Sequence, residues 1–449
     1  MAEITSIHHL TAAGMRERLT AGTVGVEALH DDLLRLAEAA QQQFHPFANL
    51  DEQVIRLQAA HRQAERTSGE PPGRLYGVPV AVKDIIDTVD FPTAFGSPIH
   101  EGRYAVADAT IVRRLRDAGA VIFGKTVTTE FATFHPGPTR NPHDPQRTPG
   151  GSSSGSAAAV AAGVVPLALG TQTNGSVLRP ASFCGVYGFK PSLGLLPRTG
   201  IFEQSPTLDQ PGLFARDIED LALATEVMSG DDGFDPSTRA QPPRQLLKVC
   251  REEPPVTPRL CFVRTPWWEQ VDPEAREAFD AFVELMEGVV VRVDLPDVVR
   301  QAVQWHHCVN EVELAFALQR EYRHHAEGLS EALRQRVARG MQTPAVDYLA
   351  ARDRIPHVAG AFDSYFEHFD AILSPAALGP APLGLASTGD PIMQTVWTFA
   401  GLPALSMPLL NLSGNLPLGV QAVGPLFNDG RLLRTCRWLV REFLQRSQT

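Results

Sequence analysis

Hydrophobic and polar residues follow two patterns along the chain, one typical of surface helices and one typical of buried strands. In residues 10–65, leucine and alanine recur at helical spacing among charged residues, which indicates amphipathic surface helices. Residues 76–84 form an apolar run bounded by a glycine and a charge, which fits a buried strand with Lys83 at its end. Residues 110–119 predict a helix closed by a glycine, and residues 120–124 predict the next strand. This strand–helix–strand order predicts a layered α/β fold.

The pattern changes twice in the second half of the chain. Residues 230–258 are rich in Asp, Pro, Arg and Gln, which indicates a surface loop or a break between two halves. Residues from about 273 to 352 are charged and almost wholly helical in pattern, which predicts a helical cover on the core. Residues 371–373 and 418–423 are again strand-like, and a closing helix is expected from about 429 to 445.

Composition and charge exclude several classes of protein. With 43% hydrophobic and 20% charged residues over 449 positions, the chain suits a large packed core. A formal net charge of −11 indicates no basic face for phosphates, so no nucleic-acid partner is expected. Five scattered cysteines without a CxxC pair favour neither a disulfide framework nor a zinc site. Because there is no secretory signal pattern, and the longest apolar run is too short to span a bilayer, we expect a cytoplasmic protein without a membrane partner.

The most unusual segment is residues 150–156, seven consecutive glycines and serines. Flexible linkers have the same composition. A linker separates domains, however, whereas this segment runs into a small-residue helix and an apolar strand-like stretch at 164–169, so we place it inside the core. A Gly/Ser loop before a helix gathers backbone N–H groups and hydroxyls, which suits polar chemistry or anion binding. Phosphate binding is not expected, because the Lys-Ser/Thr ending of a P-loop is missing.

A second such loop, GTQTNGSVLRP at residues 170–180, contains Ser176. A serine after a glycine is usually structural. In this loop, however, the successive N–H groups of Thr173, Asn174, Gly175 and Ser176 could converge on one oxygen, as an oxyanion hole requires. No histidine or carboxylate near Ser176 in the sequence is placed so as to indicate a base, so a lysine becomes the candidate base.

At these positions the sequence resembles the amidase signature family. The matching stretches are GVPVAVKD, PT with GS shortly after it, DATIVRRLRDAGAVIFGKTVTTEFA, PGGSSSGSAAAVAAG, GTQTNGSVLRPASFCGVYGFKPS and, near the end, AGLPALSMP with LPLGVQAVGP. The resemblance covers residues 70–220 strongly and 365–445 clearly, whereas residues 1–70 match loosely and 230–360 match only in helical character.

The resemblance implies one amidase domain over residues 1–449, a three-layer α/β/α fold around a large mixed central β-sheet. Within this domain the parts are a helical N-terminal part at 1–65, a signature core at 70–220, a helical cover at about 273–352 and a C-terminal sheet and helix at 365–449.

The resemblance also implies the catalytic roles. Ser176 is the nucleophile that becomes acylated, Ser152 the relay and Lys83 the base, and a cis peptide bond is expected between Gly151 and Ser152. A lysine can act as a base near neutral pH only if its pKa is lowered, and burial can lower it by up to about 3–5 units. Arg179 either contacts substrate or holds the loop by a buried ion pair, the second being favoured.

Two positions depart from the usual pattern of the family, which commonly has Asp where this chain has Gln172 and Gly where it has Asn174. Asn174 adds a side chain beside the oxyanion loop and is expected to contact substrate. Gln172 favours the small-molecule or carbamate-hydrolase branch over the branch that acts on glutamine to mature aminoacyl-tRNA. The adjacent histidine pairs at 306–307 and 324–325 lack the i, i+4 spacing of metal ligands, so no metal is expected.

The resemblance therefore implies a cofactor-free hydrolase, a monomer or homodimer, that cleaves amide-type C–N bonds of small or medium molecules. Aryl amides and carbamates (urethanes) remain open as substrates, because attack on a carbamate carbonyl would use the same oxyanion hole. The alternatives are a glutamine-hydrolysing subunit of an amidotransferase complex and an inactive scaffold. Retention of Lys83, Ser152 and Ser176 together argues against the scaffold.

Overall fold

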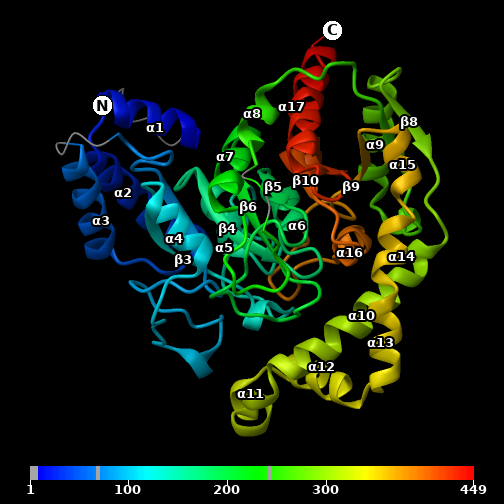
Figure 1. Ribbon diagram of the computed structural model, residues 1–449, viewed down its shortest axis with the longest axis horizontal. Helices are drawn as coiled ribbons and strands as arrows, with labels where there is room; N and C mark the ends of the chain where they lie inside the picture. The colour runs from blue at the N-terminus through cyan, green and yellow to red at the C-terminus, as the bar shows by residue number, and fades with distance from the viewer. Residues whose placement is uncertain (1–8, 67–70, 241, 243, 449) are drawn as a thin grey trace.

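The computed structural model describes residues 9–66, 71–240, 242 and 244–448, and Figure 1 shows how their helices surround a central sheet. The strands are β1 (Phe47–Asn49), β2 (Pro79–Lys83), β3 (Val121–Thr126), β4 (Leu167–Gln172), β5 (Tyr187–Lys190), β6 (Gln210–Ala215), β7 (Leu260–Val263), β8 (Val290–Val293), β9 (Ala371–Pro375), β10 (Ala404–Leu412) and β11 (Leu416–Val423). In this described part they form one eleven-stranded sheet in the order β1-β3-β2-β4-β6-β5-β10-β11-β9-β7-β8. The sheet is mixed, because β2 runs parallel to β3 and β4 whereas β6 runs antiparallel to β4. The predicted α/β class with a large mixed sheet is confirmed.

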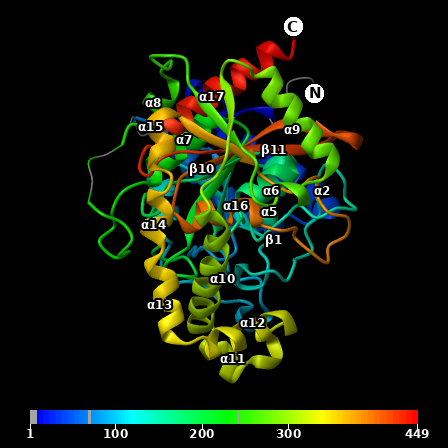
Figure 2. The same cartoon turned by 90° about the vertical axis from the view of Figure 1, so that its right-hand side faces the viewer.

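Helices cover both faces of this sheet. They are α1 (Ala12–Ala21), α2 (Val26–Phe44), α3 (Glu52–Glu65), α4 (Thr110–Asp117), α5 (Ser154–Ala161), α6 (Leu178–Cys184), α7 (Ile218–Met228), α8 (Leu246–Arg251), α9 (Pro273–Leu285), α10 (Val298–Ala317), α11 (Gln319–His324), α12 (Glu331–Gln342), α13 (Ala345–Asp353), α14 (Ile355–Gly360), α15 (Asp363–His368), α16 (Ile392–Phe399) and α17 (Asp429–Arg446). On one face α7 packs against β6 and α17 against β10, while on the other face α5 packs against β4 and α6 against β10 and β11. Figure 2 shows the strands between these two groups.

The predicted helical cover includes an arm, formed by α10 to α13, that extends from the body of the molecule. Helix α10 contacts α12 and α13 within the arm and α16 at its base (Figure 1). The expectation of an almost wholly helical segment at about 273–352 was wrong at one place, because residues 290–293 form the edge strand β8. Only Val290 of this short strand is buried, so no alternating pattern long enough to indicate a strand could develop. The loop expected at 230–258 likewise contains the short helix α8.

The elements that position the later site are buried on all sides. Every residue of β2 is buried between β3 and β4, as its unbroken apolar run predicts. Helix α5 consists of small residues and packs closely on the sheet, with seven of its eight residues buried. Helix α4 turns its buried residues Ile111, Val112 and Leu115 to the core and ends just before Gly119, whose φ of +92° suits glycine.

No helix in the described ranges combines the length and the apolar character that a membrane crossing requires. All five cysteines are free thiols, four of them buried.

We predict that Gly155→Ala destabilises the protein. A Cβ at Gly155 would overlap the carbonyl oxygen of Pro46 and the backbone nitrogen of Val127, neither of which is the end of a flexible side chain. Overpacking of this kind costs about 1–3 kcal/mol, so the melting temperature in a calorimetric scan should fall by several degrees. Gly360→Ala is the matched control, because a Cβ there approaches only Asp363, at 3.8 Å. Equal melting temperatures for the two variants would contradict the tight packing of α5.

Candidate functional site

Lys83 is fully buried at the end of β2 and faces two hydroxyl groups. Its Nζ lies 2.7 Å from Ser152 Oγ and 2.8 Å from Thr171 Oγ1. Burial lowers the pKa of Lys83 to about 7, while the negative charge of Asp209 acts in the opposite direction. A substantial fraction of Lys83 is therefore neutral at neutral pH. In that form its lone pair can accept the Ser152 proton while an N–H donates to Thr171.

The Gly/Ser loop that carries Ser152 is part of the core, as expected. The side chains of Ser152, Ser153 and Ser154 are buried, and the peptide bond from Gly151 to Ser152 is cis, as predicted. Ser153 Oγ donates to the carbonyl of Thr171 and accepts from its N–H, both at 3.2 Å, which joins the loop to β4. The loop then continues directly into α5. Ser152 is thereby held beside the end of β2.

The second loop runs from the end of β4 into the start of α6, and the carbonyl groups of three of its residues accept hydrogen bonds. The three hydrogen bonds are His306 Nε2 to Thr173 O at 2.8 Å, Thr398 Oγ1 to Asn174 O at 2.5 Å and Arg179 N to Gly175 O at 3.2 Å. In a trans peptide the C=O and N–H groups point in opposite directions. The N–H groups of Asn174, Gly175 and Ser176 therefore point away from these partners. No described residue accepts a hydrogen bond from them.

Ser176 is partly exposed and lines a small pocket together with Thr173, Asn174 and Gly175. The structure thus brings Lys83 into contact with Ser152 and places Ser176 beside the three loop residues named for the oxyanion hole. No hydrogen bond in the described part of the chain joins Ser176 to Ser152.

Arg179 links the two loops from its place in α6. It is 2% exposed, donates from Nη2 to the carbonyl of Gly151 at 2.8 Å and from Nε to the carbonyl of Thr388 at 2.8 Å. The residue therefore holds the Gly/Ser loop, but through carbonyl oxygens rather than through the buried ion pair that was favoured. It also lines the Ser176 pocket.

The two positions that depart from the family pattern make different contacts. Gln172 Oε1 accepts from the N–H groups of Val177 and Leu178, at 2.8 and 3.0 Å, and so holds the start of α6. Asn174 lines the pocket, and its Oδ1 accepts from Thr395 Oγ1 at 2.7 Å. Its role in substrate contact stays a prediction.

The local sequence pattern did not predict that three residues contact the site. They are Thr171, Asp209 and His306. Asp209 lies just before β6, and the antiparallel pairing of β6 with β4 brings it next to Thr173. Thr173 Oγ1 donates to Asp209 at 2.5 Å, and the N–H of Ser205 donates to it at 2.9 Å. Burial raises the pKa of Asp209 to about 6.

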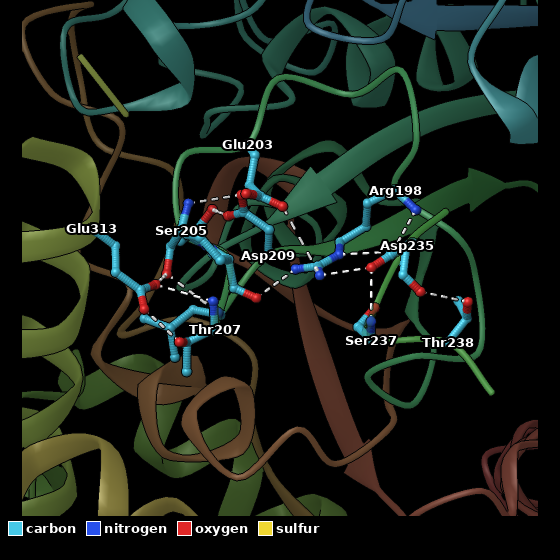
Figure 3. A network of polar contacts seen from close by, with 12 residues as sticks. Arg198, Glu203, Ser205, Thr207, Asp209, Asp235, Ser237, Thr238 and Glu313 are labelled. Atoms are coloured by element: carbon cyan, nitrogen blue, oxygen red, sulfur yellow. Dashed lines mark hydrogen bonds and ion pairs between the residues drawn. The ribbon is translucent and has the colours of Figure 1, made fainter. Parts of the chain in front are cut away.

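The segment around Asp209 is fixed by further carboxylates, as Figure 3 shows. Glu313 of α10 accepts from the side chains of Ser205 and Thr207, and Asp235 holds Arg198 by hydrogen bonds of 2.9 Å. The helical arm therefore contacts the Asp209 segment through Glu313 and the second loop through His306.

His306 is a buried hydrogen-bond donor to the second loop. Burial lowers its pKa to about 3, so the ring is neutral and its Nε2–H donates to the carbonyl of Thr173. Among the residues that the structure describes, no group of three or more His, Cys, Asp or Glu side chains could hold a metal ion.

Known proteins resemble this chain in sequence and in fold. The family model described as Amidase matches residues 28–433. The chain is 33% identical to a glutamyl-tRNA(Gln) amidotransferase subunit from Thermobifida fusca (strain YX), over 95% of its own length and 94% of that protein.

Solved structures match the fold over nearly the whole chain. A structure from work on a vestigial protein complex and the evolutionary origins of an s-triazine catabolic enzyme is 28% identical, with a TM-score of 0.89 and 98% of each chain covered. The peptide amidase of Stenotrophomonas maltophilia is 26% identical, with a TM-score of 0.81, 98% of this chain and 97% of that chain covered.

The matched region contains both loops and every described strand of the sheet, including the strand that ends at Lys83, and it extends from α2 to α17. The branch interpretation based on Gln172 stays a prediction, because the relative from Thermobifida fusca compared above is an amidotransferase subunit. On the family match and on the near-complete coverage of these relatives, this chain belongs to the amidase signature family of hydrolases.

Proposed function

We propose that this protein hydrolyses amide C–N bonds of small or medium molecules through an acyl-enzyme on Ser176. The observation that carries the proposal is the contact between buried Lys83, whose pKa is lowered to about 7, and the hydroxyl of Ser152. A neutral amine beside a hydroxyl can act as a general base without a histidine.

The proposed reaction moves one proton along the relay and returns it. Ser176 Oγ forms a bond to the substrate carbonyl carbon as its proton passes to Ser152, whose own proton passes to Lys83. When the tetrahedral intermediate collapses, the C–N bond breaks and the leaving nitrogen takes a proton back through Ser152. Water then cleaves the ester on Ser176 by the same relay, which releases the acid and restores the enzyme.

The loop at residues 173–176 is the proposed oxyanion hole. The N–H groups of Asn174, Gly175 and Ser176 point away from the partners that bind the loop carbonyls, and the donors are fixed before substrate arrives. Preorganised donors of this kind stabilise the charge that develops on the carbonyl oxygen. Aryl amides and carbamates present the same carbonyl geometry and are proposed as further substrates.

A second candidate is a glutamine-hydrolysing component of an amidotransferase complex in the cytoplasm. The names of the 30–33% identical relatives favour it. The two candidates differ in their need for a partner, because an independent amidase acts alone.

We predict that the purified chain hydrolyses a chromogenic anilide without a partner, and that Ser176→Ala lowers the rate at least about 100-fold. Only this hydroxyl is proposed to form the acyl-enzyme. The control is Ser413→Ala, an exposed serine that does not line the pocket, which should keep the parental rate. Circular dichroism checks that the variants fold.

Residual activity of Ser176→Ala above about a hundredth would exclude Ser176 as nucleophile. Activity that appears only with glutamine and a partner protein would favour the amidotransferase candidate.

We predict that kcat/KM rises with pH along a limb whose apparent pKa is about 7. Only neutral Lys83 can accept a proton, so the rate should be low below this pKa and level off above it. Lys83→Arg should be nearly as damaging as Lys83→Ala, because a guanidinium stays protonated. A Lys83→Arg enzyme with most of the parental rate and an unchanged profile would show that Lys83 is not the base.

We predict that Asp209→Asn shifts this limb to lower pH. The negative charge of Asp209 raises the pKa of Lys83, so removing it should lower that pKa further. The pH–rate profile measures the shift, and Asp31→Asn, which removes a half-exposed carboxylate that pairs with Arg56 on the helices α2 and α3, should leave the limb in place. A limb that does not move, in a variant with native circular dichroism, would show that Asp209 does not act on the base.

A further inference from the structure

The side-chain amide of Gln172 is held in one orientation. Gln172 is fully buried at the end of β4, and its Oε1 lies 2.8 Å from Val177 N and 3.0 Å from Leu178 N. A backbone N–H can only donate, so the atom that faces both of these groups is the amide oxygen. The amide nitrogen must then point the other way, where Nε2 donates to Thr398 Oγ1 at 2.9 Å.

Thr398 passes this direction on to the second loop. It lies near the end of α16 and is 1% exposed. Because its Oγ1 accepts from Gln172 Nε2, its single proton is directed to the carbonyl of Asn174, at 2.5 Å. A hydroxyl that accepts one hydrogen bond is a stronger donor in the next one. Gln172, Thr398 and Asn174 therefore form a chain of hydrogen bonds with one direction.

The backbone of Thr398 is held as well as its side chain. Gln210 Nε2 donates to the carbonyl of Thr398 at 3.2 Å and to that of Leu208 at 3.1 Å. Lys190 Nζ donates to Gln210 Oε1, which fixes the orientation of this second amide. Lys190 and Gln210 are both buried. The position of the Thr398 hydroxyl is thus set by the core.

The chain of hydrogen bonds ends on a peptide group of the proposed oxyanion hole. The carbonyl of Asn174 and the N–H of Gly175 belong to the same planar peptide unit and point in opposite directions. A hydrogen bond to the carbonyl polarises this unit, so its N–H becomes a stronger donor. Gly175 lines the pocket beside Ser176, and no described residue accepts from its N–H.

We infer that Thr398, oriented by Gln172, is a positioning residue that fixes and strengthens the Gly175 N–H as an oxyanion donor. The inference rests on the proposed amide hydrolysis at Ser176. Neither Thr398 nor Gln172 is among the described residues that line the pocket, so both act through the loop. The inference also gives a role to the departure at position 172, because the Asp that is usual there has no N–H to donate.

Isotope labelling reads the last hydrogen bond of the chain without turnover. Asn174 and Gly175 form the only Asn-Gly pair in the sequence. Protein with ¹³C in its asparagine carbonyls and ¹⁵N in its glycines therefore gives one NMR signal that joins a carbonyl carbon to the amide after it. A carbonyl carbon resonates at higher frequency when it accepts a hydrogen bond. The Asn174 carbon should move to lower frequency when this bond is lost.

Two variants remove the bond in different ways. Thr398→Val keeps the shape of the side chain and removes the hydroxyl. Gln172→Glu keeps the acceptor for the start of α6, but its carboxylate cannot donate and draws the Thr398 proton away from Asn174. The control is Thr225→Val on α7, which removes a buried hydroxyl without a partner among the described residues and should leave the signal in place. An Asn174 signal that moves in neither variant would overturn the inference.

Kinetics test the effect on the reaction. Rates on a chromogenic anilide are compared at alkaline pH, where Lys83 is neutral. Loss of one oxyanion donor costs about 10²–10³ in kcat, so a weakened donor should cost about 10-fold in Thr398→Val and in Gln172→Glu. KM should change less than about 2-fold, because the oxyanion forms only in the transition state.

Rescue and coupling distinguish positioning from a general structural role. Thr398→Ser, which keeps the hydroxyl, should recover most of the parental kcat. The double variant Thr398→Val/Gln172→Glu should be about as slow as the slower single variant, because both changes remove the same hydrogen bond. A parental kcat in both single variants, or losses that multiply in the double variant, would refute the inference.

The two readouts separate this inference from the proposed function. A parent that does not hydrolyse the anilide would refute the proposed function, and the carbon signal would still show whether Thr398 holds the Asn174 carbonyl. An active parent whose signal moves in neither variant would remove the inference alone. Circular dichroism checks folding, and if one single variant does not fold, the other makes the same comparison.

Discussion

The removal of the Lys83 amine from water is the constraint on which the rest of the site depends. The chain buries three lysines at or near strand ends, and burial alone lowers the pKa of each, so their partners decide what they can do. Lys190 donates to Gln210 Oε1 and to the carbonyl of Leu402, both of which can only accept, and such partners favour the protonated amine. Lys125 lies 3.5 Å from the carboxylate of Asp84, which also favours the charge.

Lys83 differs because both of its partners are hydroxyls, which can donate as well as accept. Neither partner requires the amine to stay charged. This arrangement needs a fully covered strand, which β3, β4 and the small residues of α5 provide. The closeness of α5 to the sheet is thus part of the same burial on which the proposed role of Lys83 as a base depends.

Local sequence pattern predicted the strand that ends at Lys83, the two polar loops and their place in the core, because apolar runs and glycine positions act over a few residues. Thr171, Asp209 and His306 were out of reach of such patterns. Asp209 reaches the site through the antiparallel register of β6 on β4, and His306 through the packing of a helix from the arm. Strand β8 was missed because four residues at a sheet edge, only one of them buried, show no clear period.

The strand order has a consequence for how the chain is made. Strand β5, which follows the second loop and α6, lies between β6 and β10, and Lys190 pairs with Ala404. During translation the sheet edge at β5 stays open until residues 404–412 have left the ribosome, because no earlier segment occupies that position. An open edge inside a future sheet can pair with another chain, and contacts so distant in sequence form slowly. The middle of the sheet is therefore completed late, and nascent chains that stop within the arm would expose this edge to aggregation.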